Sequence, residues 1–551
     1  MNHFKNLPIS NILADIQSTL NTRSKLVIQA PPGAGKTTSV PLFMLGLDWS
    51  KGKKIIMLEP RRIAARAAAQ FMAASLNEDV GQTVGYRVQL DTCVSAQTRL
   101  EIVTEGILTR MIQSDPELSD VAAIIFDEFH ERNLNGDLGL ALALDCQEAF
   151  NEELKIIVMS ATLDGEKISK LLDNAPIITS EGRSFEVTPV YLGEPITGRN
   201  ARNKREALLA SLQAAISSAL AQDTGSILVF VAGEFEIRAL EKDLRGRRLP
   251  DNVDIRPLFG ALTLSEQRNA IAPSPEGRRK IVLATNIAET SLTIDGISIV
   301  IDSGYHRKAA YNPSNGLTTL ETKRISLASA TQRMGRAGRL GPGKCYKLWD
   351  RNQEGGFQPY EAPEITTSNL SDLALQLASW GCQDPKDLRW IDMPPPGLFE
   401  QAKEELRTLE LINSDGSLTI LGKHAVNLPV SARLSKMLLV GVVLGREDEA
   451  CNLAALLSER DFLSFESQSD ILLRYEKLKK GDAPKKISVF SKMLKKRLAK
   501  LPHSEIRNTT FANSLRSHES KLQFLPDLIG TLLSFAYPDR IALTRNKGGT
   551  Q

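Results

Sequence analysis

Ten short apolar runs, rich in β-branched residues, recur between residues 26 and 349 and alternate with helix-like stretches. Runs that are apolar at nearly every position are typical of strands buried on both faces of a parallel sheet. The pattern restarts after Pro176, so the chain is predicted to fold as two successive α/β sheets. The predicted strands are 26–30, 54–58, 100–104, 122–128 and 154–160, followed by 187–193, 226–232, 280–285, 297–302 and 344–349.

Two other segments depart from this alternation. Residues 303–323 contain Asn-Pro and Asn-Gly turn signals between polar, strand-like pieces, which predicts a projecting hairpin. From about residue 366 the pattern becomes helical, as in 370–381 and 432–445, with a break at PPPG, residues 394–397.

The composition is that of a globular protein, with 42% hydrophobic and 24% charged residues in a chain of 551. This length predicts about three or four domains, and the composition excludes a disordered, collagenous or membrane-embedded chain. The longest apolar run, from Met437 to Leu444, is far shorter than the roughly 20 residues that cross a bilayer. Five widely spaced cysteines without a CxxC pair argue against a disulfide framework or thiolate zinc site. No secretory signal is recognised at the start, so a reducing, cytoplasmic setting is expected.

The formal net charge of +3 hides an asymmetry along the chain. Residues 471–551 carry 17 Lys and Arg against 6 Asp and Glu, whereas residues 1–470 carry a net charge of −8. Within the basic end, residues 485–500 combine seven cations with helical spacing of apolar residues. A basic helix face favours phosphate contacts, and an ordinary solvated helix surface is the alternative.

The stretch 26–45 reads as a strand, a glycine-rich turn and a helix, which is the context of a phosphate-binding loop. Backbone N–H groups at such a helix start surround a β-phosphate, while a lysine reaches the β/γ oxygens and a hydroxyl binds Mg²⁺. One departure is Ala30, which stands where the pattern GxxxxGK[ST] has its first glycine. The predicted nucleotide-binding residues are Ala30, Pro31, Pro32, Gly33, Ala34, Gly35, Lys36, Thr37 and Thr38.

A pair of adjacent carboxylates, Asp127 and Glu128, ends the predicted strand at 122–128. An aspartate at a strand end beside a phosphate-binding loop can hold Mg²⁺, and the next glutamate can orient and deprotonate a water. Thr37, Asp127 and Glu128 are therefore the candidate metal ligands, with Glu128 as the candidate base. The structural alternative is that the pair only begins a helix.

Three arginines recur in the second half of the chain, at Arg333, Arg336 and Arg339. Guanidinium groups from a second domain can neutralise charge on a transferring phosphoryl group. A basic turn that binds carboxylates or backbone phosphates is the alternative.

Taken together, the motifs resemble superfamily 2 helicases of the DEAH/RNA helicase A group. Residues 127–142 resemble the bacterial HrpB-type members, and 427–439 resembles the helicase-associated region of this branch. The motifs, in order, are APPGAGKTT (30–38), EPRRIAARAAAQ (59–70), TEGILTRM (104–111), DEFH (127–130), SAT (160–162), FVAGEFEI (230–237), TNIAETSLTIDG (285–296) and QRMGRAGR (332–339).

The resemblance implies two RecA-like lobes, 1–180 and 181–355, then a winged-helix-like part at 356–445 and a helical, ratchet-like basic part at 446–551. It implies an ATP-dependent RNA helicase or translocase that uses ATP and Mg²⁺ and binds single-stranded and duplex RNA, with the hairpin 305–322 separating strands. A DNA helicase, or an ATP-gated clamp that does not unwind, is the alternative. In relatives more chain follows 536–543, so a missing C-terminal portion is expected.

The resemblance also assigns roles to individual residues. Lys36, Asp127, Glu128, Gln332, Arg336 and Arg339 are implied in hydrolysis. His130, Ser160 and Thr162 are implied in coupling hydrolysis to lobe movement. Contacts to the nucleic-acid backbone are implied for Arg61, Arg62, Thr104, Gly233, Thr285 and Asn286.

One departure concerns the nucleobase. Some relatives stack an aromatic residue on the base, but the corresponding segment 266–274 has none, and Phe71 in the helix after Arg61 and Arg62 is the aromatic residue nearby. Triphosphate contacts are then expected to dominate, which predicts relaxed nucleoside specificity.

Overall fold

The computed structural model describes residues 7–31, 33–161, 165–182, 185–193, 201–247, 249–289, 294–463, 470–517 and 528–542. The chain divides into two compact units. Unit 1 comprises residues 1–368 with 389–392, and unit 2 comprises 369–388 with 393–551. Of the predicted site residues, Pro32 and Thr162 lie outside the described residues.

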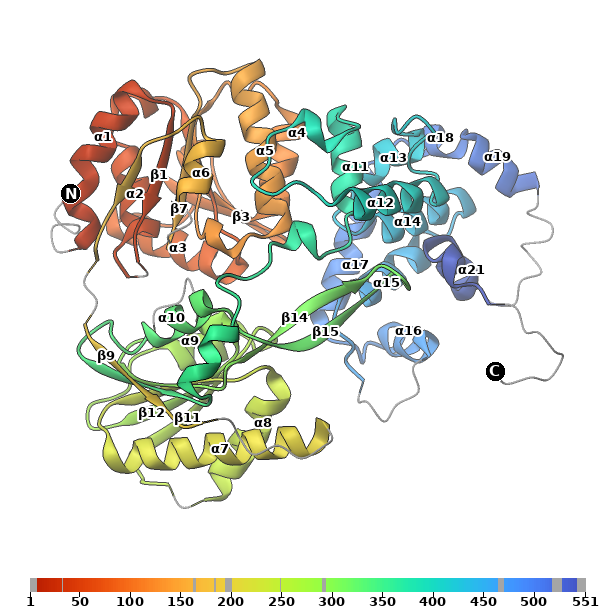
Figure 1. Cartoon of the computed structure of the whole chain (residues 1–551). Coiled ribbons are helices and arrows are strands. Elements are labelled where there is room, and N and C mark those ends of the chain that lie inside the picture. The colour runs from red at the N-terminus through yellow and green to blue at the C-terminus, as the bar shows by residue number, and fades with distance from the viewer. Residues whose placement is uncertain are drawn as a thin grey trace, which may run out of the picture. The chain divides into compact units, whose positions relative to one another are not determined.

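The first lobe of unit 1 is built on an eight-stranded sheet in the order β4-β3-β5-β2-β6-β7-β1-β8, parallel except for β4 (Figure 1). Its central strands are buried along nearly their whole length, as the apolar runs predict. The strands are β1 Lys25–Gln29, β2 Lys54–Leu58, β3 Val84–Val88, β4 Asp91–Cys93, β5 Leu100–Val103, β6 Val121–Phe126, β7 Lys155–Ser160 and β8 Ile177–Thr179.

Side chains that alternate along these strands point to the two faces of the sheet. On one face Ile28, Met57 and Ile125 join a core with Ile16 of α1 and Met72 of α3. The helices of this lobe are α1 Leu13–Thr22, α2 Lys36–Met44, α3 Arg62–Ser75, α4 Glu105–Ser114, α5 Leu134–Ala149 and α6 Gly165–Leu171.

The second lobe contains a six-stranded parallel sheet in the order β11-β12-β10-β13-β16-β9. Ile227 and Val229 face α7 and α8, whereas Leu228 and Phe230 face α9 and the segment near Ala337. The strands are β9 Val187–Tyr191, β10 Ser226–Phe230, β11 Val253–Leu258, β12 Arg279–Ala284, β13 Ile297–Asp302 and β16 Gly343–Lys347. The helices are α7 Ala201–Gln222, α8 Glu234–Gly246, α9 Leu264–Ile271 and α10 Leu327–Met334.

The predicted hairpin is formed by β14, Tyr305–Asn312, and β15, Leu317–Arg324, which pair antiparallel over their full length. It leaves the second lobe as a long two-stranded ribbon (Figure 1). Apart from His306, its side chains are exposed or half-buried, so it adds little to the core of this lobe.

Unit 2 is helical and is organised around α14, Ala432–Leu444, nearly all of whose residues are buried. Helix α14 packs against α13, α15, α18 and α21. The remaining helices are α11 Ser371–Trp380, α12 Pro396–Thr408, α13 Ile420–Ala425, α15 Glu447–Ser458, α16 Ile471–Lys480, α17 Lys485–Leu498, α18 His503–Arg507, α19 Thr510–Ser517 and α21 Leu528–Ala536.

The predicted α/β class, its two sheets and the helical C-terminal region are confirmed. All ten predicted strands are present, with ends that differ by at most two residues. The sequence pattern missed β3, β4, β8 and β11, which lie at or near sheet edges, because edge strands lack the continuous apolar run of a strand buried on both faces.

Candidate nucleotide and nucleic-acid site

The glycine-rich turn after β1 requires glycine at two positions. Gly33 and Gly35 have φ of 89° and 93°, a region that other L-residues rarely adopt. A Cβ atom on Gly35 would also lie 2.8 Å from Leu7 Cδ1. Gly35 is the N-cap of α2, so the first-turn N–H groups of Lys36, Thr37 and Thr38 lack intrahelical acceptors and can bind an anion.

The Lys36 ammonium is buried against the two carboxylates at the end of β6. Its Nζ donates to Glu128 Oε1 at 2.9 Å and lies 3.7 Å from Asp127 Oδ1. Burial alone would lower the pKa of Lys36, but Glu128 and Asp127 outweigh it and raise this pKa. The lysine therefore stays charged, as a phosphate ligand requires.

Asp127 and Glu128 differ in their surroundings. Burial raises the pKa of Asp127 to about 6, although Lys36 opposes this and Thr37 Oγ1 donates to Asp127 Oδ2. For Glu128, the charge of the adjacent Lys36 outweighs burial and lowers the pKa to about 2. Glu128 also has φ of 49°, a left-handed conformation that costs a non-glycine residue about 1–3 kcal/mol and that is concentrated at functional sites.

His130 connects this carboxylate pair to the turn after β7. The Ala161 N–H donates to His130 Nδ1 at 3.3 Å, and His130 Nε2 lies 3.5 Å from Glu128 Oε2. Because Nδ1 accepts, the proton of the neutral ring is on Nε2 and faces Glu128. Burial lowers the pKa of His130, which favours this neutral form. Ser160 is buried at the end of β7, where its carbonyl accepts from the N–H of Ala30 at 3.1 Å.

Glu59 is a third buried carboxylate at this site, and sequence reasoning did not select it. It follows β2, the strand beside β6, and both of its carboxylate oxygens are buried without a hydrogen-bond partner. Burial, reinforced by Asp127 and Glu128, raises its pKa well above the usual range. Its position after the strand that pairs with β6 is the signal that could have identified it.

The three arginines of the second lobe have different surroundings. Arg333 is fully buried, with ion pairs of 2.9 Å to both Glu289 and Asp302, and it stacks over Phe230. Its contacts are those of a structural residue. Arg336 donates from Nε to the Glu289 carbonyl at 3.0 Å.

The charge of Glu128 reaches both of the other arginines across the lobes. It partly opposes the lowering of the pKa of Arg336 by burial. Burial likewise lowers the pKa of Arg339 to about 10, again opposed by Glu128. Both guanidinium groups therefore lie within electrostatic range of the candidate base.

A cavity of about 700 Å³ brings the phosphate-binding loop together with both lobes. Phe71, whose side chain is 57% exposed, lines it from α3, and Arg268 lines it from α9. The other lining residues are Leu7, Gly33, Gly35, Lys36, Thr37, Thr38, Glu59, Ile63, Ala64, Arg66, Ala67, Ala68, Gln70, Glu128, Gln267, Ile271, Ala272 and Arg339.

Helix α9, which forms the second-lobe wall of this cavity, is fixed at both ends. Thr263 and Glu266 form a capping box at its start. At its end the buried Lys280 ammonium donates to the carbonyls of residues 270, 271 and 272 at 3.2, 3.0 and 2.7 Å. A cation at a helix C-terminus also favours the helix dipole.

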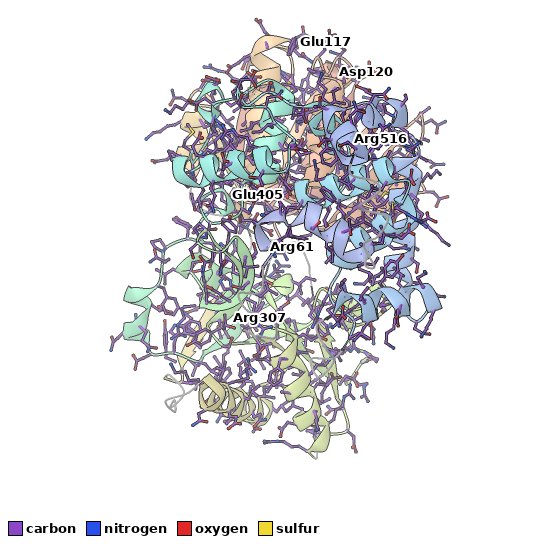
Figure 2. All side chains as sticks on the ribbon, turned by 90° about the vertical axis from the view of Figure 1, so that its right-hand side faces the viewer. Arg61, Glu117, Asp120, Arg307, Glu405 and Arg516 are labelled. Carbon is purple, nitrogen blue, oxygen red and sulfur yellow. The ribbon has the colours of Figure 1, made fainter. Side chains whose placement is uncertain are left out.

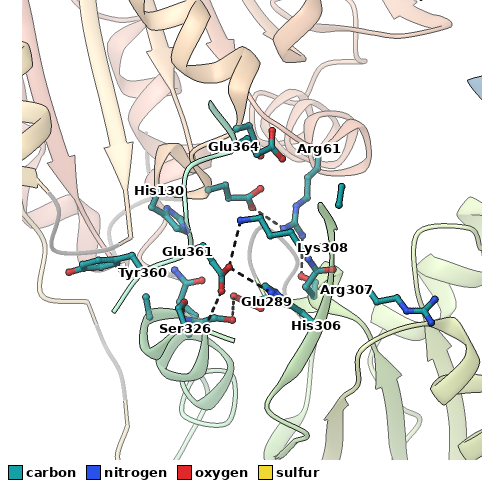
Figure 3. Close-up of a pocket in the computed structure, with 17 residues that line it drawn as sticks. Arg61, His130, Glu289, His306, Arg307, Lys308, Ser326, Tyr360, Glu361 and Glu364 are labelled. Atoms are coloured by element: carbon teal, nitrogen blue, oxygen red, sulfur yellow. Dashed lines mark hydrogen bonds and ion pairs between the residues drawn. The ribbon is translucent and has the colours of Figure 1, made fainter. Parts of the chain in front are cut away.

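A second cavity, of about 280 Å³, is lined by His130 and by residues from both lobes (Figure 3). Gln332 lines this cavity together with Arg61 and His130. Figure 3 shows His130 and Arg61 entering from the first lobe and Lys308 and Ser326 from the second.

Two of the predicted nucleic-acid residues meet at this second cavity. Arg61 donates to the carbonyls of Asn286 and Ile287 at 3.4 and 3.1 Å, and it pairs with Glu131 at 3.0 Å. Its guanidinium group thus joins the lobes.

The other predicted nucleic-acid residues are dispersed over both lobes. Arg62 donates to Gln89, and Thr104 and Thr285 precede α4 and a short 3₁₀ turn. A Cβ on Gly233 would lie 3.0 Å from Arg307. Arg61 and Arg307 can be followed in Figure 2.

Comparison with known families decides the classification. Residues 13–171 match the DEAD/DEAH box helicase family, and 204–341 match the helicase conserved C-terminal domain. The chain belongs to the DEAD/DEAH box helicases.

Individual members of this family resemble the chain over most of its length. It is 45% identical over 456 residues to the ATP-dependent RNA helicase HrpB of Escherichia coli K12, covering 82% of this chain and 55% of that protein. A crystal structure of the E. coli DEAH/RHA helicase HrpB matches 97% of this chain and 64% of its own, with TM-score 0.84 and 40% identity. A structure of the E. coli DExH-box NTPase HrpB matches 98% of this chain and 62% of its own, with TM-score 0.82 and 40% identity.

The chain thus spans somewhat more than half the length of these helicases. The similarity to HrpB-type helicases predicted from the motifs is confirmed, as are the two RecA-like lobes. Among the described residues, no helix is both long and apolar enough to cross a bilayer.

Proposed function

We propose that this protein is an ATP-dependent RNA helicase or translocase, which couples ATP hydrolysis to movement on single-stranded RNA and to duplex unwinding. The observation that carries the proposal is one cavity lined by Lys36, Thr37 and Glu128 from the first lobe and by Arg339 from the second. A site divided between two lobes links their relative position to the presence of the γ-phosphate.

The triphosphate is bound at the start of α2 by backbone N–H groups and Lys36. In the structure, the Lys36 ammonium donates to Glu128 and lowers its pKa. A bound phosphate draws this ammonium toward itself, and the pKa of Glu128 then rises. Glu128 then becomes a stronger base toward the attacking water, and Arg339 and Arg336 stabilise negative charge on the transferred phosphoryl group.

Oxygen donors suited to Mg²⁺ surround the same position. Thr37, Asp127 and Glu128 present a hydroxyl and two buried carboxylates, and Glu59 adds two buried oxygens without partners. Among the described residues no three His, Cys, Asp or Glu side chains converge on a metal by themselves. This fits Mg²⁺, which is commonly held by one or two carboxylates and the substrate phosphates. When bound, the ion neutralises charge on the β- and γ-phosphates.

Coupling to lobe movement is assigned to His130 with Ser160 and Thr162. His130 contacts Glu128 and the backbone of Ala161 at once, so a shift of the base is transmitted to the turn after β7. Gln332, which lines the same cavity as His130, is assigned to positioning the attacking water.

RNA is proposed to bind along Arg61, Arg62, Thr104, Gly233, Thr285 and Asn286, mostly through its backbone, and therefore with little sequence preference. The similarity to HrpB, an ATP-dependent RNA helicase, favours RNA over DNA. The hairpin β14–β15 is proposed to separate the strands of the RNA duplex. We also propose four domains, with boundaries after residues 180, 355 and 445. Five cysteines, none in a disulfide, support a reducing, cytoplasmic setting.

The decisive experiment measures ATP hydrolysis with matched RNA and DNA oligomers, and unwinding of duplexes that carry a 3′ or a 5′ single-stranded tail. RNA is expected to stimulate hydrolysis more than DNA, because nucleic acid that favours lobe closure completes the arginine contacts. Stimulation by neither polymer would refute the helicase assignment. Stimulation by RNA without unwinding would favour the ATP-gated clamp.

Nucleoside specificity tests the base end of the cavity. Phe71 and Arg268 offer a planar ring and a guanidinium group, which stack on any base. GTP and CTP are therefore expected to be hydrolysed at saturating RNA at rates near that of ATP. Failure to use either would show that base edges are read.

A further inference from the structure

The basic end of the chain contains a stripe of lysines on the solvent face of α17. The buried face of this helix consists of Ile487, Phe490, Ser491, Leu494 and Leu498. At about 100° per residue, Lys485, Lys492 and Lys496 fall in one sector of about 40° on the opposite face, and Lys500 follows in the turn after the helix. All four are exposed. These four residues are the lysine stripe, whose part within the helix is about 17 Å long.

Two lysines that flank the stripe have carboxylate partners. Lys486 pairs with Glu459 at 2.7 Å, and Lys495 pairs with Asp448 of α15 at 2.8 Å. In the part of unit 2 that the structure describes, no ion pair involves any lysine of the stripe.

The stripe is also unfavourable for the helix that carries it. Lys485 lies in the first turn of α17, where the helix dipole disfavours a cation. Lys492 and Lys496 are four residues apart within the helix, and like charges at this spacing repel. The helix dipole favours Lys496 in the last turn of α17, as it favours Lys477, Lys479 and Lys480 in the last turn of α16. It does not account for Lys485 or Lys492. Such local conflicts are expected where function maintains them.

We propose that the lysine stripe is a nucleic-acid docking surface, which binds the phosphate backbone of RNA in addition to the residues of the two lobes. A row of cations with no partner in the described protein is complementary to a polyanion with regularly spaced charges. Val489, 53% exposed within the stripe, adds an apolar contact for sugar or base. This inference rests on the proposed function, because it assigns a further contact to the same RNA.

The test compares two double variants of one helix in the otherwise unchanged chain. Lys492→Gln with Lys496→Gln removes two charges from the stripe, and Lys486→Gln with Lys495→Gln removes two charges that are paired with carboxylates. Binding of a fluorescein-labelled single-stranded RNA is measured by anisotropy over a range of KCl concentrations.

For the stripe variant, the slope of log K against log salt concentration is expected to become shallower by about 1.4, since each lost phosphate contact reduces it by about 0.7. The paired-lysine control should keep the wild-type slope, and so should Lys492→Arg with Lys496→Arg, which preserves the charge. Circular dichroism checks that the variants are folded.

Equal slopes for wild type, stripe variant and control would refute RNA binding by the lysine stripe while leaving the helicase assignment in place. A wild-type protein that binds no RNA would overturn both. A stripe variant that keeps the RNA slope but no longer binds phosphatidylserine vesicles would also overturn the proposal and would assign the surface to anionic lipid.

Discussion

Replacement of Arg333 should destabilise the second lobe and not merely slow the reaction, although Arg333 belongs to the same motif as Arg336 and Arg339. Its guanidinium group is fully buried between Asp302 and Glu289. Arg333→Met removes the cation and leaves both carboxylates, of which Asp302 is also fully buried.

The magnitude follows from these contacts. Breaking a buried ion pair by removing one partner costs about 3–5 kcal/mol, and loss of the contact over Phe230 adds about 0.5–2 kcal/mol. Protonation of Asp302, whose pKa burial already raises, limits the cost, so about 3–5 kcal/mol is expected. For a lobe of this size, each kcal/mol lowers Tm by about 2–4 °C, which gives a decrease of about 10 °C.

The assay is thermal unfolding of the full chain, followed together with ATPase activity. Arg339→Met is the control, because it should reduce hydrolysis with little change in Tm. Adding Asp302→Asn to Arg333→Met should restore part of the lost stability, since the most deeply buried unpaired charge is removed. An unchanged Tm for Arg333→Met, or an equal loss for Arg339→Met, would refute the structural role.

Three further predictions concern the nucleotide site. Glu128→Gln should lower turnover by about 10²–10⁴-fold while retaining ATP binding, because it removes the base but not Lys36; wild-type turnover in a stopped-flow phosphate assay would exclude Glu128 as the base. Gly35→Ala should weaken ATP binding in calorimetry, because φ of 93° strains any residue with a Cβ by about 1–3 kcal/mol, and binding at wild-type affinity would contradict this reasoning. Lys280→Met should lower Tm, because it leaves three carbonyls at the end of α9 without their donor. A Tm for Lys280→Met equal to that of wild type would show that these contacts do not stabilise the end of α9.

Much of the site was predictable because its chemistry follows local patterns. A strand that ends in a glycine-rich turn places Lys36 and Thr37 at a helix start, and a buried strand that ends at Asp127 carries its carboxylates to the same edge of a parallel sheet. Both relations depend on segments of about ten residues, whose periodicity and turn residues are visible in the sequence.

The roles of the arginines were not predictable in this way. Arg333, Arg336 and Arg339 recur every three residues in the sequence, but only the packing of α10 against β13 shows that Arg333 points into the lobe. The contact of Arg61 with the Asn286 carbonyl, 225 residues away in the sequence, likewise depends on how two lobes meet.

The sequence by itself determined the order of the strands along the chain, the phosphate-binding turn, the adjacent carboxylates and the basic end. Tertiary structure decided which charged groups are buried together. It paired Lys36 with Glu128 and placed Glu59, whose carboxylate oxygens have no hydrogen-bond partner, beside them. It also brought the Lys280 ammonium to the last carbonyls of α9 and exposed one face of α17 that carries lysines. The physical reason is that backbone conformation responds to neighbours within a few residues, whereas the energy of a charge depends on burial and on partners that arrive from anywhere in the chain.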